Sequence, residues 1–216
     1  MYLSDIFDYL TNGELSQHVL GGAELGVIDA SNYHQVISNV NAGILELYKR
    51  FPLLIKKASV SFVADTTDYT VNYPDLLLIE KILAEDATEY AFNESDNKYS
   101  ILLMAYNQLY VPLDLHDYYL DQVNDTTFVI QYKARPTLLD KNPVDPAVVE
   151  VPLPDQYTEA LLNYVTYRIF AGINANNPDT VNYYNKFESA CALLRNAGTF
   201  NKESALNLRL ENNGWL

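Results

Sequence analysis

The residues best suited to chemistry in this sequence gather in the segment "DLHDYYLDQ", residues 114–122. It brings Asp114, His116, Asp117 and Asp121 close together in the chain. Carboxylates and an imidazole at such spacing are typical of a metal site or of an acid/base pair. A solvated acidic loop has the same composition, and we favour that interpretation because the cluster is a weak signal for a metal or acid/base site.

The rest of the sequence lacks the motifs that catalysis needs. The segment "LGGAELG" has glycines but neither the lysine nor the strand-to-helix context of a phosphate loop. "DTTD" and "ESDN" lack the ligand periodicity and the final glutamate of a calcium loop. We therefore expect no enzyme, no cofactor and no bound metal. An enzyme acting on cell-wall polymer is the alternative from another class, with Glu80, Asp114 and Asp121 as acid/base groups.

Length and composition favour a globular protein. A chain of 216 residues, 49% of them hydrophobic, fits one large domain or one domain with an insertion, and it can bury a real core. No apolar run approaches the roughly 20 residues that span a bilayer, and the N-terminus lacks the features of a signal peptide. Cys191 is the single cysteine, so we expect a buried thiol in a helix and no disulfide framework. These features predict a protein that is assembled in a cytoplasm.

The charge balance excludes a protein that holds nucleic acid by neutralising phosphates. The formal net charge is -14, from 28 acidic and 14 basic residues. Lys49 is the first basic residue of the chain, after six acidic ones. A solvated surface explains this acidity most simply. The sharper interpretation is a surface that lets a polyanion pass without holding it.

Helical spacing of apolar residues appears at both ends of the chain. We predict helices over residues 2–12, ended by Gly13, and from about Ser31 as N-cap to Pro52. Two further helices follow Asp155, joined by "GINANNPD" with Asp179 near the second N-cap. Because this connection is short, the two helices should pack as antiparallel neighbours.

The centre of the chain alternates with the period of strands. "SVSFVADTTDYTVNYP" predicts a hairpin, "DLLLIEKILAED" a buried strand, and "TTFVIQYKARP" the clearest single strand. Residues 99–108 fit either a strand or a short helix. The fold class is therefore α+β, mainly a bundle of N- and C-terminal helices with a β-rich insertion. We predict a helical domain over 1–57 and 151–198, the β-rich insertion over 58–150, and an extended docking tail over 199–216.

The abundance of tyrosine, 18 residues, favours an interaction protein over an enzyme, because each ring buries area while its hydroxyl stays wet. Arg168 follows an apolar stripe in "NYVTYRIF" and should lie at the edge of a buried face. It either pairs with an acid of a neighbouring element or subunit, or it snorkels to solvent. The candidate partner-contact residues are Arg168, Phe200, Leu206, Leu208, Leu210 and Trp215.

Three segments resemble the head-to-tail adaptor (connector) proteins of tailed bacteriophages. "ILELYKRFPLLIKKASVSFVADTTDYTVNYPDLLLIEKI" is similar to their N-terminal half. "VPLPDQYTEALLNYVTYRIF" with "DTVNYYNKFESACALL" is similar to their C-terminal helical hairpin, and "LSDIFDYLTNGEL" fits their start. The resemblance covers most of the chain and rests on packing patterns.

This resemblance implies a structural virion protein in the neck between capsid and tail. It implies a ring, usually of twelve subunits, that binds the portal protein on one side and a tail or nozzle protein on the other. The genome would leave through the ring's channel without specific binding, and no membrane is involved. The alternatives are a head-completion or tail-terminator ring protein, the cell-wall-degrading enzyme, and a carbohydrate- or protein-binding module that uses the tyrosines.

Overall fold

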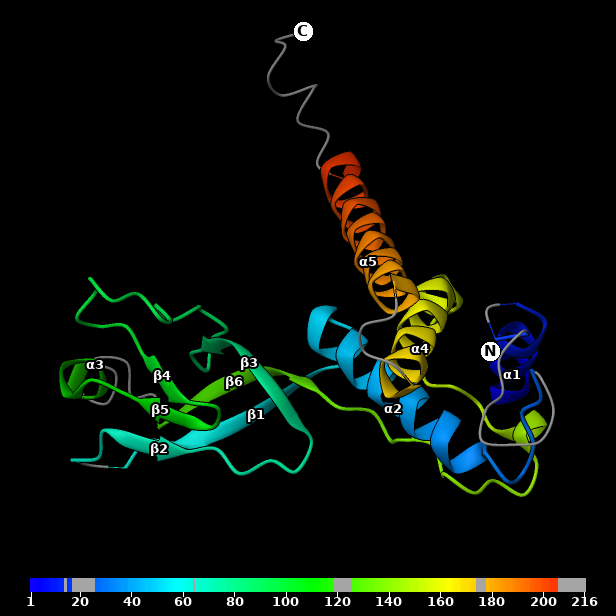
Figure 1. Cartoon of the computed structure of the whole chain (residues 1–216). Coiled ribbons are helices and arrows are strands. Elements are labelled where there is room, and N and C mark those ends of the chain that lie inside the picture. The colour runs from blue at the N-terminus through cyan, green and yellow to red at the C-terminus, as the bar shows by residue number, and fades with distance from the viewer. Residues whose placement is uncertain (14, 17–25, 64, 119–125, 174–177, 206–216) are drawn as a thin grey trace, which may run out of the picture. The chain divides into compact units, whose positions relative to one another are not determined.

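The computed structural model describes residues 1–13, 15–16, 26–63, 65–118, 126–173 and 178–205. Helices and two small antiparallel sheets make a mixed α+β fold, which confirms the predicted class (Figure 1). The arrangement of the terminal helices as a bundle stays a prediction. The elements are α1 (Leu3–Asn12), α2 (Tyr33–Arg50), β1 (Ile55–Ser61), β2 (Asp68–Thr70), β3 (Leu76–Leu83), β4 (Leu102–Ala105), β5 (Gln108–Tyr110), α3 (Leu113–Tyr118), β6 (Thr127–Ala134), α4 (Thr158–Ile173) and α5 (Pro178–Ala205).

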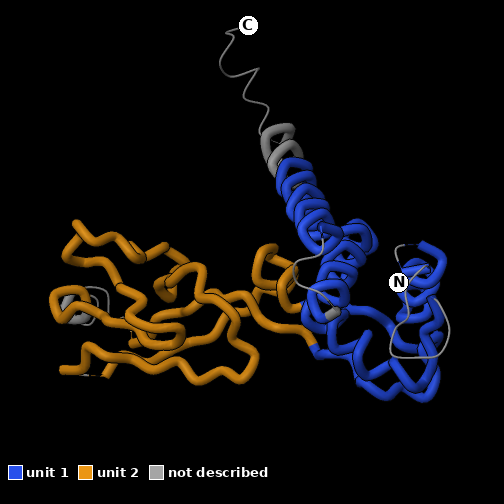
Figure 2. Tube along the Cα trace, in the orientation of Figure 1, with its two compact units in different colours: residues 1–44, 137–216 blue, residues 45–136 orange. Residues whose placement is uncertain are grey.

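The chain divides into two compact units, coloured separately in Figure 2. We call residues 1–44 with 137–216 the helical unit, and residues 45–136 the β unit. The division therefore falls inside α2. The predicted domain limits at 58 and 150 stay a prediction.

The helical unit buries the apolar stripes that the sequence predicted. On α1, the buried side chains are Leu3, Ile6, Phe7 and Leu10, and Gly13 follows the helix. The α2 residues of this unit contact α4 closely: a Cβ added at Gly43 would lie 2.7 Å from Leu161 Cδ1. Glycine lets the two helices approach there.

The start of α2 differs from the prediction. The helix begins at Tyr33, two residues after Ser31, so that Asn32 and not Ser31 directly precedes it. The Ser31 hydroxyl donates to the Asp29 carboxylate at 2.6 Å, so it belongs to a polar turn ahead of the helix. The Asn32 side chain closes the same turn by accepting from the Asp29 N–H at 2.9 Å. Asx and Ser residues favour such local turns as readily as true caps, which is why the sequence placed the start too early.

The β unit contains two three-stranded sheets around one core, with strand orders β1-β6-β3 and β2-β5-β4. The central strand β6 buries Phe128, Ile130 and Tyr132, as its alternation predicted. Rings from the other sheet complete the packing: Tyr69 meets Phe128 edge-on at 5.5 Å between centroids. The strand predicted at "DLLLIEKILAED" is β3, although Leu78 is exposed rather than buried.

One prediction for this unit is wrong. The segment "SVSFVADTTDYTVNYP" is no hairpin, because β1 pairs with β6 and β2 pairs with β5. Of the two alternatives for residues 99–108, the structure has the strand, with β4 at residues 102–105. Alternation along a chain identifies strands, but partners that lie 38 to 78 residues apart are chosen by the shared core and not by local sequence.

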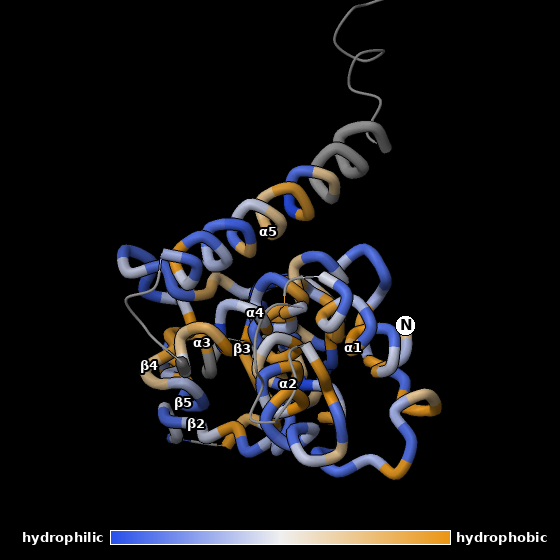
Figure 3. The backbone as a smooth tube through the Cα atoms, turned by 45° about the vertical axis from the view of Figure 1, so that its right-hand side comes forward, coloured by the Kyte–Doolittle hydropathy of each residue, from blue (hydrophilic) through white to orange (hydrophobic). Residues whose placement is uncertain are grey.

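The C-terminal hairpin forms as predicted and then continues. Helix α5 begins at Pro178, so Asp179 lies within the first turn, where its charge complements the helix dipole. The helix extends through residues 199–205, which the prediction assigned to an extended tail. Residues 206–216 lie outside the described part of the chain. Figure 3 shows that α5 alternates between hydrophilic and hydrophobic turns along its length.

Candidate functional site

Two of the three residues proposed for acid/base chemistry, Glu80 and Asp114, lie in the described part of the chain, and each forms an ion pair with a lysine. Glu80 on β3 lies 3.4 Å from Lys133 Nζ, and Asp114 on α3 lies 3.4 Å from Lys98 Nζ. Asp121 lies outside the described residues. Within the described residues, no group of three or more His, Cys, Asp or Glu side chains could hold a metal ion. These two carboxylates therefore serve ion pairs with lysines.

A row of aromatic pairs joins α4 to α5. Ring centroids lie 5.0 Å apart for Tyr164 and Phe187, 5.2 Å for Tyr167 and Tyr184, and 5.4 Å for Phe170 and Tyr183. The pairs run in opposite directions along the two helices, which are thus antiparallel as predicted. Phe187 is fully buried whereas Tyr184 is 39% exposed, so the row reaches from the core to the surface. Aromatic contacts of this kind stabilise by about 0.5–1.5 kcal/mol each beyond their buried area.

Arg168 lies on α4 beside this row. Its side chain is exposed, while Ile169 and Phe170 next to it are buried. Within the described residues it forms no ion pair. Its five N–H donors suit a carboxylate on another chain.

The other predicted contact residues lie at the end of the chain. Residue 200 belongs to the helical extension of α5. Leu206, Leu208, Leu210 and Trp215 lie outside the described residues.

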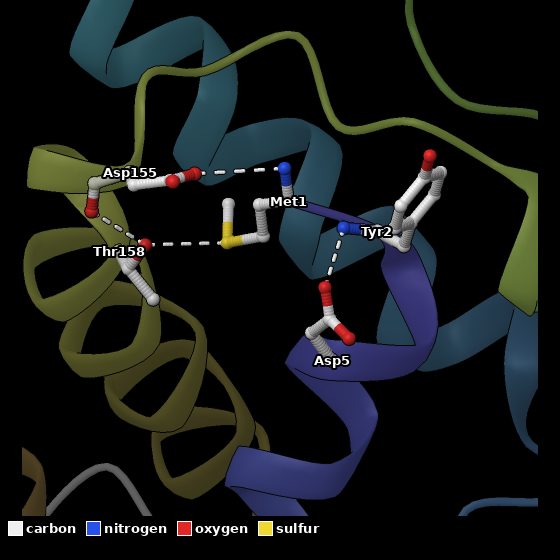
Figure 4. A network of polar contacts seen from close by, with 5 residues as sticks. All are labelled: Met1, Tyr2, Asp5, Asp155 and Thr158. Carbon is white, nitrogen blue, oxygen red and sulfur yellow. Dashed lines mark hydrogen bonds and ion pairs between the residues drawn. The ribbon is translucent and has the colours of Figure 1, made fainter.

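Sequence reasoning missed the way the first residues of the chain are held. Leu3 N–H donates to Val149 O at 2.9 Å, and Val151 N–H donates to Met1 O at 3.0 Å. The Met1 amino nitrogen lies 3.5 Å from an Asp155 carboxylate oxygen, and the Thr158 hydroxyl lies 3.2 Å from Met1 Sδ (Figure 4). These contacts join the start of the chain to the start of α4. Residues 150 positions apart carry no local signal of such pairing.

An open groove of about 580 Å³ lies beside this junction. Three carboxylates, those of Asp5, Asp8 and Asp155, line it together with the ring of Tyr9, which is 57% exposed. The Tyr2 N–H donates to Asp5 Oδ2 at 2.7 Å, so the Asp5 carboxylate also caps the start of α1 (Figure 4). The groove therefore combines an acidic lining with one exposed ring.

Comparison with known families decides the kind of protein. The sequence profile of the SU10 adaptor protein family matches residues 13–207, almost the whole chain. The chain belongs to the SU10 adaptor protein family. The resemblance to phage head-to-tail adaptors is thereby confirmed, and the chain is a structural adaptor component of a bacteriophage virion.

Membership of the SU10 adaptor family indicates what the exposed surfaces described above could contact. An adaptor interacts with other head and tail components of the phage, so exposed aromatic and charged groups outside the cores are candidate contacts. A search of curated proteins finds no match to the chain. No helix in the described residues is long and apolar enough to cross a membrane.

Proposed function

We propose that this SU10 adaptor protein assembles as a ring between the portal and the tail of the phage. The ring has twelve subunits, binds the portal on one side and a tail or nozzle protein on the other, and assembles in the host cytoplasm. The family match over residues 13–207 is the observation that carries this proposal.

The acidic balance supports a channel that the genome passes through. With a net charge of -14, each subunit repels the phosphate backbone, so DNA slides past without binding. A binding channel would instead need clustered lysine and arginine side chains on its wall. The channel wall, with the acidic side chains that face it, forms only when the ring assembles.

The portal contact is formed by the C-terminal part of the chain. Arg168 presents an exposed guanidinium, and residues 206–216 contribute Leu206, Leu208, Leu210 and Trp215 as apolar anchors. Aromatic and arginine side chains dominate the binding energy of protein interfaces, which favours Arg168 and Trp215 as the main contacts.

Electron microscopy of the purified protein mixed with the portal of the same phage tests the proposal. We expect rings stacked on the portal, and the symmetry of the class averages gives the stoichiometry. An Arg168→Ala variant should bind the portal at least about tenfold more weakly. The control is Lys141→Ala, which removes another exposed cation and should leave portal binding unchanged. A protein that ignores the portal but caps the tail, or that degrades cell-wall polymer, would overturn the proposal in favour of the terminator or enzyme alternative.

A further inference from the structure

The charges of the β unit are segregated along its strands, although the unit is acidic overall. Four exposed cations gather where β1 begins and β6 ends, and we call them the basic end: Lys49, Lys56, Lys57 and Arg135. Ile55 pairs with Lys133 at this end of the sheet. Lys133 Nζ donates to the Lys49 carbonyl oxygen at 3.0 Å, which joins the last turn of α2 to the same end.

Four exposed carboxylates lie where β1 ends and β6 begins, and we call them the acidic end: Asp65, Asp68, Glu85 and Asp86. Ser61 pairs with Thr127 here, and the Thr127 N–H donates to Glu85 Oε1 at 3.1 Å. Hydrogen bonds from Thr127 hold the pKa of Glu85 below its usual value, and those from Thr88 do the same for Asp86. These hydrogen bonds favour the ionised form of Glu85 and of Asp86.

The two ends are too far apart to neutralise each other. Strand β1 has 7 residues, and at about 3.3 Å per residue it spans roughly 20 Å. The Debye length at physiological salt is about 8 Å. Within the described residues, Lys56 pairs with Asp75, whereas Lys49, Lys57 and Arg135 form no ion pair. Each end therefore presents its charge outward.

A closed ring needs this kind of asymmetry. Neighbouring subunits in a ring meet through two different surfaces, one from each copy, which must be complementary to each other. We propose that the basic end of one β unit binds the acidic end of the β unit in the next copy. This inference rests on the proposed ring and adds the surfaces that close it.

A nucleic acid is the other polyanion that a basic end can attract. The β unit holds fourteen acidic and eight basic residues, a net charge of -6, which opposes the close approach of a long phosphate backbone. An acidic end with as many charges as the basic end is present on every copy. Charge complementarity therefore favours a second copy of this chain.

A charge-swap experiment tests the inference in the full-length protein assembled on the portal. The first variant reverses the basic end with Lys49→Glu, Lys57→Glu and Arg135→Glu. It spares Lys56, whose pairing with Asp75 supports the fold. We expect at least about tenfold weaker ring assembly, because like charges then face each other.

The second variant reverses the acidic end. Ser61→Lys and Asp68→Lys add cations at two exposed positions, and Asp65→Asn and Asp86→Asn remove two charges. Asparagine is chosen because Asp65 has a φ of 56° and the Asp86 side chain accepts from the Thr88 N–H. Both roles suit asparagine. Glu85 is kept because it anchors Thr127.

Each variant alone should assemble at least about tenfold more weakly than the wild type, and an equimolar mixture of the two should form rings with alternating subunits. Lys141→Glu with Lys186→Glu, which reverses two exposed cations of the helical unit, is the matched control and should assemble like the wild type. Circular dichroism of each free variant checks that it folds. Mass photometry on the portal gives the yield of rings.

The outcomes separate this inference from the proposed function. Failure of the wild-type protein to form rings on the portal overturns the proposed function itself. Wild-type rings with unchanged assembly of both folded variants, or with no recovery in the mixture, overturn only the inference. Weaker binding of a duplex DNA probe by the first variant, with assembly unchanged, would assign the basic end to nucleic acid instead.

Discussion

The Asn41 side chain and the Leu139 backbone exchange two buried hydrogen bonds across 98 positions of the chain. Asn41 Nδ2 donates to Leu139 O at 2.9 Å, and Leu139 N–H donates to Asn41 Oδ1 at 2.9 Å. The Asn41 amide thus pairs with the Leu139 backbone as a neighbouring strand would. The two hydrogen bonds hold the segment around Leu139 against the part of α2 that belongs to the helical unit. Asn41 is 5% and Leu139 is 8% exposed.

Replacing Asn41 by alanine should lower the free energy of unfolding by about 2–4 kcal/mol, because it leaves a buried N–H and C=O of Leu139 unpaired. Urea unfolding followed by circular dichroism measures this change. Asn182→Ala, at an exposed position of α5, is the control and should change stability by less than about 0.5 kcal/mol. Equal effects of the two substitutions would contradict the structural role of Asn41.

Two glycines in helices should respond to alanine in opposite directions. A Cβ at Gly43 would lie 2.7 Å from Leu161 Cδ1 and 3.1 Å from Tyr164 Cδ1, whereas nothing lies within 4 Å of one at Gly172. Leu161 is fully buried and cannot move away easily. Gly43→Ala should destabilise by about 1 kcal/mol, since overpacking exceeds the gain in helix propensity. Gly172→Ala should stabilise by about 0.5–1 kcal/mol. Thermal melts that rank the two variants in the reverse order would refute the close α2–α4 contact.

Lys133 supports the junction of α2 with the sheet. Its side chain is only 10% exposed, and its ammonium lies 3.4 Å from Glu80 and 3.0 Å from the Lys49 carbonyl oxygen. Lys133→Met leaves both acceptors without this cation and should cost about 1–3 kcal/mol of unfolding free energy. Lys141→Met, at an exposed position, should leave the urea midpoint unchanged. A Lys133→Met protein as stable as the wild type would show that solvent replaces the ammonium without loss.

Acid should weaken the β unit through Asp75. The Lys56 ammonium, together with the Tyr132 hydroxyl, holds the pKa of the Asp75 carboxyl below its usual value. Because the folded pKa is lower than the unfolded one, ionised Asp75 stabilises the fold at neutral pH. That stability is lost as the pH falls from about 4 through the folded pKa. The urea midpoint of the wild type should drop over this range, and Asp75→Asn should be less stable at pH 7 but less sensitive to acid. An equally steep pH dependence in both proteins would assign the effect to other carboxylates.

Two truncations separate the helical extension of α5 from the residues after it. A chain ending at Ala205 keeps the whole of α5, and a chain ending at Gly198 lacks residues 199–205 as well. We expect the shorter deletion already to weaken portal binding by at least about tenfold, because it removes Trp215 and the three leucines. The melting temperature should stay within about 2 °C, since the aromatic row between α4 and α5 is intact. Loss of binding only after the longer deletion would place the contact on α5 itself.

Part of this fold could be predicted from the sequence because its signals are local. The stripe of Leu3, Ile6, Phe7 and Leu10 on α1, the buried Cys191 on α5 and the alternation of β6 depend on residues within one or two turns of each other. The absence of catalytic motifs and the pattern of the C-terminal hairpin were also readable along the chain. That hairpin is one of the three segments that carried the resemblance to the adaptor family.

The tertiary structure alone decided which distant residues meet. Strand β1 pairs with β6 rather than β2, because the buried faces of three strands match and loop closure over many residues costs little more than over few. Asn41 with Leu139, and Met1 with Asp155, are likewise pairs without any local signal. The segregation of charge into two ends of the β unit follows from that strand pairing, since the cations and the carboxylates are scattered along the sequence.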